Sequence, residues 1–158
     1  VWADLGYHMQ PSRALPKLLW GLHEYQNTAG SPQISLQKGV KVAHQTDFIN
    51  RRLIGHEVPS DTSSSLKTGY DLLRNTWPRD VFAQLAIPEE ILPAVVLSGT
   101  TIGTVCKQAA LKTGIPAGTA VIAGMTDSCA AQIGAGALSV ADACTQKRRL
   151  QPETAFVL

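Results

Sequence analysis

The stretch TIGTVCKQAALKTGIPAGTAVIAGMTDSCAAQIGAGA, residues 101–137, decides the fold class because its pattern alternates between two kinds of element. Residues 101–106 and 119–123 are short, largely apolar runs typical of strands, whereas residues 107–113 and the Ala-rich residues 126–137 favour helices. A strand, helix, strand, helix order is typical of an α/β layer. We therefore predict an α/β fold.

Upstream of this stretch the pattern is more helical. Residues 15–26 place leucines at offsets of three, four and seven, which makes one apolar face of an amphipathic helix. A second helix is predicted over residues 44–53, ending at Gly55, which tolerates the left-handed conformation of a C-terminal cap. Residues 27–39 predict a surface connection, and the polar residues 59–78 predict a loop with short ordered pieces.

The composition is that of a globular domain and limits the classes of partner. The 158 residues are 44% hydrophobic and 16% charged, and the 14 basic and 12 acidic residues are spread along the chain. This charge distribution does not indicate a nucleic-acid partner or a membrane surface. The three cysteines lack the spacing of a zinc site or a disulfide framework, and no apolar run is long enough to span a bilayer. We predict no metal site formed by the chain, no nucleic acid, no membrane, and a cytoplasmic location, with import into an organelle left open as the alternative.

The join between TAVIAG and TDSCAA, at Thr126 and Asp127, is the first candidate site. In open α/β sheets ligands bind where strands end, and the following helix presents free backbone N–H groups there. An ionised aspartate at this place could accept a proton from a bound hydroxyl. The alternative is that either residue only caps the helix, and the local sequence favours that reading.

The polar run at residues 60–71 is the second candidate site. Asp61, Lys67 and Asp71 bring together donors and acceptors that suit a polyol. A plain loop with a turn at Gly69 explains the same residues, and the local sequence favours it. Neither of the standard phosphate-binding motifs, GxxxxGK[ST] or GxGxxG after a strand, is present.

Several segments carry a family pattern through their order and spacing. They are SRALPKLLWGLHEY (12–25), AHQTDFINRRLIG (43–55), SDTSSSLKTGYD (60–71) followed by Trp77-Pro78, LPAVVLSGTTIGTV (92–105) and AALKTGIPAGTAVIAGMTDSCAAQIGAGAL (109–138). Together, over about residues 12–139, they resemble the FGGY carbohydrate kinases. The last two are similar to the end of the family's first domain, and LKTGYD and TDS are closest in style to its ribulose and xylulose kinase branch.

The resemblance implies part of a ribonuclease H-like domain of the actin and hexokinase type, with helical insertions. Residues 1–140 would be the latter part of the family's N-terminal, sugar-binding domain. Residues 141–158 would be a divergent tail, where the family's second, ATP-binding domain is expected to begin. The implied reaction is ATP-dependent phosphorylation of a sugar, such as the ketopentoses ribulose or xylulose, with Mg²⁺ as cofactor.

The resemblance also assigns roles to particular residues. The resemblance implies Asp127 as catalytic base and Thr145 as a remnant of the phosphate-binding turn, whereas Asp61, Lys67, Asp71 and Thr126 are the sugar-binding candidates that the local sequence offers. At Asp127 the family role as a base thus takes precedence over helix capping. The basic run after Thr145 departs from the small residues that the family pattern has there.

The family's phosphate loop is not found in these 158 residues, so we expect negligible kinase activity from this chain alone. Two alternatives remain open at this stage. One is a non-catalytic product that binds a sugar or associates through exposed apolar surface, including with copies of itself. The other is an unrelated α/β domain that shares these segments by coincidence.

Overall fold

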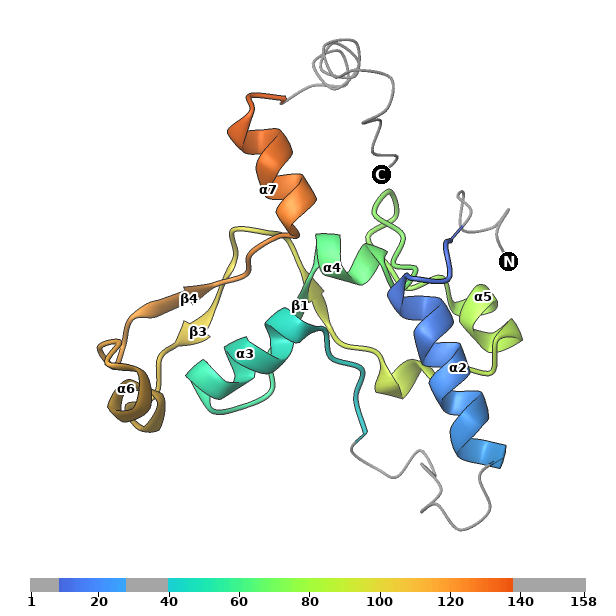
Figure 1. Cartoon of the computed structure of the whole chain (residues 1–158), viewed down its shortest axis with the longest axis horizontal. Helices are drawn as coiled ribbons and strands as arrows, with labels where there is room; N and C mark the ends of the chain where they lie inside the picture. Colours follow the sequence, from blue (N-terminus) through green and yellow to red (C-terminus); the bar gives the residue numbers. More distant parts are fainter. Residues whose placement is uncertain (1–8, 28–39, 138–158) are drawn as a thin grey trace. The chain divides into compact units, whose positions relative to one another are not determined.

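The structure is a computed structural model of the chain and describes residues 9–27 and 40–137 (Figure 1). The chain divides into two compact units, with the boundary between Gly124 and Met125. Each unit is considered by itself below. Most of the predicted surface connection, residues 28–39, and the predicted tail, residues 141–158, lie outside the described residues.

The N-terminal part of the first unit is built around helix α2 (Ala14–Asn27), which confirms the helix predicted from the leucine spacing. Leu15 on this helix has none of its surface exposed. Helix α5 (Arg79–Gln84) and the 3₁₀ turn η1 (Glu89–Ile91) supply the other side of the same core. The buried members of this core are Met9, Leu15, Phe82, Ile87, Ile91 and Leu92.

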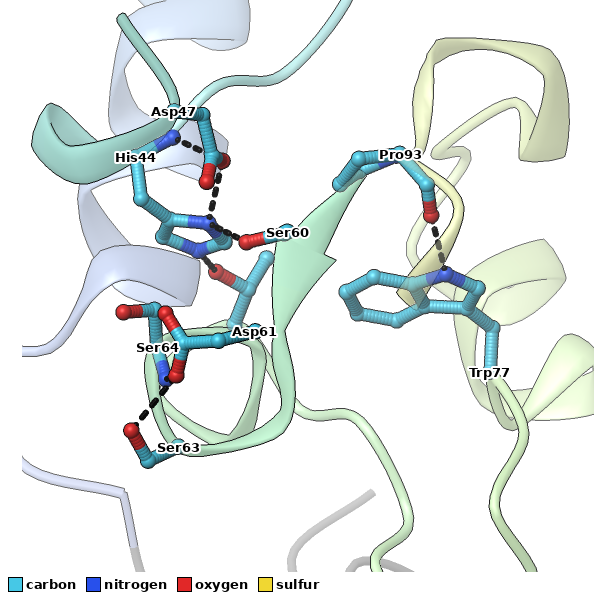
Figure 2. A network of polar contacts seen from close by, with 9 residues as sticks. His44, Asp47, Ser60, Asp61, Ser63, Ser64, Trp77 and Pro93 are labelled. Atoms are coloured by element: carbon cyan, nitrogen blue, oxygen red, sulfur yellow. Dashed lines mark hydrogen bonds and ion pairs between the residues drawn. The ribbon is translucent and has the colours of Figure 1, made fainter. Parts of the chain in front are cut away.

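Trp77 links this core to the polar segment before it. Its ring lies edge-on to Tyr70, with centroids 5.1 Å apart, and edge-on to Phe82, with centroids 5.6 Å apart. Its indole Nε1–H donates a hydrogen bond to the carbonyl oxygen of Pro93 at 3.0 Å (Figure 2). Edge-to-face pairs and a satisfied N–H are what a buried anchor requires. Trp77 is therefore a structural residue of this core.

The polar residues 59–78 contain short ordered pieces, as predicted. Strand β1 (Ser60–Asp61) pairs in parallel with β2 (Val95–Val96), and helix α4 (Thr62–Leu66) follows β1 directly. Both residues of β1 are buried. The segment is therefore held in the interior by backbone pairing despite its polar sequence.

The rest of the first unit confirms the predicted order of strand, helix and strand. Strand β3 (Thr101–Thr104), helix α6 (Lys107–Thr113) and strand β4 (Ala120–Ile122) follow one another, and helix α3 (Gln45–Ile54) contacts all of them. Their second core consists of Ile54, Val58, Val105, Ala109 and Val121. Helix α3 ends at Gly55, whose φ of 97° confirms the predicted left-handed cap.

Strands β3 and β4 are antiparallel, with a register shift between Thr101 and Gly103. Gly103 has a φ of +156°, and a Cβ placed there would lie 2.9 Å from Cδ1 of Ile54. This position therefore needs glycine both for its backbone and for the close approach of α3. Because the pair is antiparallel, its two strands end at opposite edges.

The second unit contains helix α7 (Asp127–Gly134), which lies within the helix predicted at residues 126–137. None of its residues is buried. Among the helices in the described parts of the chain, none has the length and apolar character needed to cross a membrane.

Candidate functional site

A buried polar network in the described part of the first unit centres on His44 (Figure 2). His44 is the N-cap of α3, and its backbone N–H donates to Oδ2 of Asp47 at 2.8 Å. The imidazole Nδ1 lies 3.1 Å from the same Oδ2 and 2.7 Å from Oγ of Ser60. The other ring nitrogen, Nε2, lies 2.8 Å from Oγ1 of Thr68. One ring therefore joins the start of α3 to two separate points of the polar segment.

The directions of these hydrogen bonds depend on where the imidazole carries its proton, and they are assigned here for a neutral ring. A carboxylate can only accept, so the proton of a neutral ring lies on Nδ1, where it faces Asp47 and Ser60. The Thr68 hydroxyl then donates to Nε2. Asp47 is 4% exposed, and Ser60 and Thr68 are 0% exposed. In the folded chain these groups bond one another in place of water, so the loss of one hydrogen bond leaves a buried polar group without a partner, which is costly.

Asp61 follows Ser60 and is the N-cap of α4. Its Oδ1 accepts hydrogen bonds from the Ser63 hydroxyl at 2.6 Å and from the Ser64 backbone N–H at 2.9 Å. Burial by itself would raise the pKa of Asp61, but the hydrogen bonds from Ser63 and Ser64 outweigh it and lower the pKa below its usual range. Asp61 is thus a carboxylate at neutral pH, oriented by the first turn of a short helix.

Lys67 lies at the end of α4, where its backbone connects the segment to α2. Its carbonyl oxygen accepts from the Leu15 backbone N–H at 3.1 Å, and its own N–H donates to the carbonyl oxygen of Ser64 at 3.1 Å. The main chain at Lys67 is therefore fixed from both sides. Asp61 and Lys67, both predicted from the sequence to bind a sugar, occupy the two ends of one ordered segment.

Asp71 makes a tight turn. Its Oδ1 accepts from the backbone N–H groups of Leu73 at 2.9 Å and Arg74 at 3.0 Å, and its Oδ2 accepts from Nη1 of Arg74 at 3.2 Å. The Arg74 N–H, together with the Leu73 N–H and the Arg74 charge, lowers the pKa of Asp71 despite the opposing effect of burial. The structure thus gives this carboxylate a local structural task, and its role in sugar binding stays a prediction.

Thr126 and Asp127 begin α7 in the second unit. Thr126 occupies the N-cap position, but its side chain makes no capping hydrogen bond to the helix; its hydroxyl donates to Sγ of Cys129 at 3.3 Å. Asp127 is exposed, and its Oδ1 accepts from the Ser128 backbone N–H at 2.8 Å. Asp127 therefore accepts from one free amide of the first turn, while its exposed carboxylate can still meet a ligand.

The structure does not bring all of the predicted site residues together. Asp61 and Lys67 share a segment, Asp71 follows it in its own turn, and Thr126 and Asp127 belong to the other unit. Thr145 lies outside the described residues. Within residues 9–27 and 40–137, no group of three or more His, Cys, Asp and Glu side chains could hold a metal ion.

Sequence reasoning did not identify the part that His44 plays. A lone histidine at a helix start is expected to bond locally, and the Asp47 contact is of that kind. The contacts to Ser60 and Thr68 bridge 16 and 24 residues and cannot be read from a local pattern. The available clue was that hydroxyl residues stand directly beside both Asp61 and Lys67.

Comparison with known proteins connects this geometry to a family. Residues 1–134 match the N-terminal domain of the FGGY family of carbohydrate kinases. The chain is 32% identical over 127 residues to a xylulose kinase of Bacillus subtilis (strain 168), covering 79% of this chain and 24% of that protein. It is 32% identical over 119 residues to an autoinducer-2 kinase of Enterobacter sp. (strain 638), covering 72% of this chain and 20% of that protein.

Solved structures agree with these sequence matches. The crystal structure of xylulose kinase from Rhodospirillum rubrum aligns with a TM-score of 0.66 and 27% identity, over 80% of this chain and 25% of that one. Gluconate kinase from Lactobacillus acidophilus aligns with a TM-score of 0.63 and 26% identity, over 80% of this chain and 24% of that one. The chain spans about a quarter of the length of these kinases. The likeness confirms the predicted α/β, ribonuclease H-like fold, and the chain belongs to the FGGY family of carbohydrate kinases.

Proposed function

We propose that a protein containing this chain transfers a phosphoryl group from ATP to a hydroxyl of a sugar, with a ketopentose such as xylulose or ribulose as the acceptor. The observation that carries the proposal is the family match over residues 1–134, which includes the exposed Asp127 at the start of α7. The xylulose kinases among the relatives favour a ketopentose. The autoinducer-2 and gluconate kinases show that related chains carry names for other acceptors.

In the proposed reaction Asp127 acts as the general base. Its carboxylate takes the proton from the acceptor hydroxyl as that oxygen forms a bond to the γ-phosphorus of ATP, and the bond from this phosphorus to the leaving oxygen of ADP breaks. The Ser128 N–H bonded to Oδ1 would orient the carboxyl group while the other oxygen, Oδ2, faces the acceptor. Loss of this base would lower the rate by roughly 10²–10⁴-fold.

The acceptor would be held by the remaining predicted residues. Asp61 offers an ionised carboxylate whose first oxygen is already oriented by α4, although only 4% of its surface is exposed in this chain, and Lys67 offers a side-chain donor from the same segment. Asp71 and Thr126 complete the proposed set. We place ATP near Thr145, outside the described residues. Because no described cluster fits a metal ion, Mg²⁺ is proposed only as the ion that accompanies ATP. We retain the cytoplasm as the proposed location.

A second candidate function, association through apolar surface without catalysis, is favoured by the large apolar side chains that the structure exposes. Leu73 is 96% exposed, Leu111 is 89% exposed and Trp20 is 68% exposed. Contiguous apolar patches often mark contacts with other chains, so this reading requires that exposed side chains of this kind gather on one face. In this reading the chain would bind a sugar or a partner, including a copy of itself, with negligible kinase activity of its own.

The test is the melting temperature of the purified chain with a panel of pentuloses and hexuloses, each with and without ATP and Mg²⁺. A ligand that binds only the folded state raises stability by about 2.7 kcal/mol at a hundred times its Kd. A shift with D-xylulose or D-ribulose supports the proposed acceptor class. Absence of a shift with every sugar, in a chain that melts cooperatively, favours the association reading.

Phosphorylation of the same sugars in the presence of ATP is measured in parallel. We expect the chain alone to give negligible turnover. Turnover that Asp127→Asn abolishes would show that the chain is a complete catalyst and would contradict that expectation. Its matched control is Asp80→Asn, because Asp80 is an exposed aspartate in the first turn of α5 in the other unit.

A further inference from the structure

The two ends of the segment that carries Asp61 and Lys67 are tied to one imidazole. Ser60, directly before Asp61, lies 2.7 Å from Nδ1 of His44 (Figure 2). Thr68, directly after Lys67, lies 2.8 Å from Nε2. The ring therefore spans the segment from one end to the other. The two hydroxyls belong to the residues next to Asp61 and Lys67 in the sequence. These contacts therefore fix the backbone at Asp61 and Lys67.

Burial makes this connection rigid. Ser60 and Thr68 are 0% exposed, so water cannot replace the imidazole without opening the interior. The ring itself is held by Asp47, whose Oδ2 contacts both Nδ1 and the His44 backbone N–H. The start of α3 thus serves as a fixed base for the segment of residues 60–68.

The same atoms could suggest nucleophilic catalysis, because a carboxylate, an imidazole and a hydroxyl stand in sequence from Asp47 through His44 to Thr68. Burial argues against this reading. A nucleophile must reach its substrate, and the hydroxyl-bearing residues on both sides of the ring have no exposed surface. The network therefore has a structural role and not a catalytic one.

We propose that His44 is a positioning residue for sugar binding, which sets the placement of Asp61 and Lys67 through the hydroxyls of Ser60 and Thr68. The ligand in this inference rests on the proposed function. The positioning itself rests on the contacts within the first unit and can be measured without any sugar.

The decisive variants are Thr68→Val, which keeps the side-chain volume and removes the hydroxyl, and Thr68→Ser, which keeps the hydroxyl. His44→Gln and His44→Asn each keep an amide near only one of the two ring nitrogen positions. The matched control is His56→Asn, because His56 is exposed and its ring donates to the carbonyl oxygen of its neighbour Glu57 at 2.9 Å, away from the network. Cooperative unfolding is checked for every variant first.

The first measurement is the carboxyl pKa of Asp61, followed by NMR in the full chain. We expect Thr68→Val and the His44 variants to raise the pKa of Asp61 towards its ordinary value, as the α4 turn loosens, with Thr68→Ser and His56→Asn unchanged. An unchanged Asp61 pKa in folded Thr68→Val overturns the inference. If the His44 variants do not fold, the Thr68 pair decides it alone.

The second measurement is the affinity for D-xylulose by calorimetry. We expect Thr68→Val to weaken binding about tenfold, because small displacements of positioned groups are costly, and Thr68→Ser to bind as the wild type does. If the Asp61 pKa moves while the affinity for D-xylulose does not, the role in sugar binding is refuted. If the wild type does not bind D-xylulose, the proposed acceptor fails, and the Asp61 pKa still decides whether His44 positions the segment.

Discussion

Ser60 and Ser65 offer a matched pair for testing the buried network, because both are completely buried and stand five residues apart. Ser60 bonds the imidazole of His44 at 2.7 Å, whereas the Ser65 hydroxyl has no hydrogen-bond partner among the described residues. We expect Ser60→Ala to destabilise the chain and Ser65→Ala to leave its stability unchanged or raise it.

The magnitudes follow from what each substitution leaves behind. Ser60→Ala removes one hydrogen bond to a ring that keeps its contact with Asp47, so the cost is about 1 kcal/mol. Ser65→Ala removes a hydroxyl whose burial without a partner costs about 1–3 kcal/mol, and the small cavity left behind offsets part of that gain. The two variants should differ by about 1–2 kcal/mol, or roughly 2–8 °C in Tm.

The assay is urea unfolding of the full chain followed by tryptophan fluorescence, with the slope against denaturant checked for equality between variants. The backbone contacts of Ser65, whose carbonyl oxygen accepts from Thr68 and Tyr70, are the same in serine and alanine. Equal losses in the two variants, or a larger loss in Ser65→Ala, would refute the assignment of these hydroxyls.

Other predictions concern backbone space and pH. Gly103→Ala should lower the unfolding free energy by about 1–3 kcal/mol, because its Cβ would lie 2.9 Å from Ile54. The control is Gly21→Ala in α2, where a Cβ meets nothing within 4 Å, so this variant should be neutral or stabilising. Thermal melting compares the two variants, and equal Tm values would contradict the packing at Gly103. Asp61→Ala should cost about 0.5–2 kcal/mol at pH 7 through loss of the α4 cap. Since the folded-state pKa of Asp61 is lowered, the stabilisation from its ionised carboxylate is present above the ordinary pKa and is lost as the pH falls through the lowered pKa. Asp61→Ala lacks this stabilisation, so its free energy of unfolding should fall less steeply in acid than that of the wild type. An identical acid profile would count against the cap.

The local patterns predicted the helices and strands well where one face is apolar or a glycine ends the element. The leucine spacing located α2, and Gly55 located the end of α3, because both depend on neighbouring residues only. The pairing of β3 with β4 could not be obtained in this way. Whether two strands run parallel depends on contacts distant in sequence, and here α6 connects the two strands of an antiparallel pair.

Only part of the candidate site was predicted, because local patterns do not reveal contacts that are distant in sequence. Asp61 was selected as one polar residue in a polar run, and the structure adds that it caps α4 and is ionised. The role of His44 was missed because its partners lie 16 and 24 residues away. The family resemblance supplied what local chemistry could not, namely a reason to consider Asp127 as more than a residue that serves the start of a helix.

The most direct test of the account is an experimental structure of the chain bound to D-xylulose. The account predicts a sugar hydroxyl within hydrogen-bonding distance of the Asp127 carboxylate. A sugar bound with none of its hydroxyls near Asp127 would contradict the proposed base.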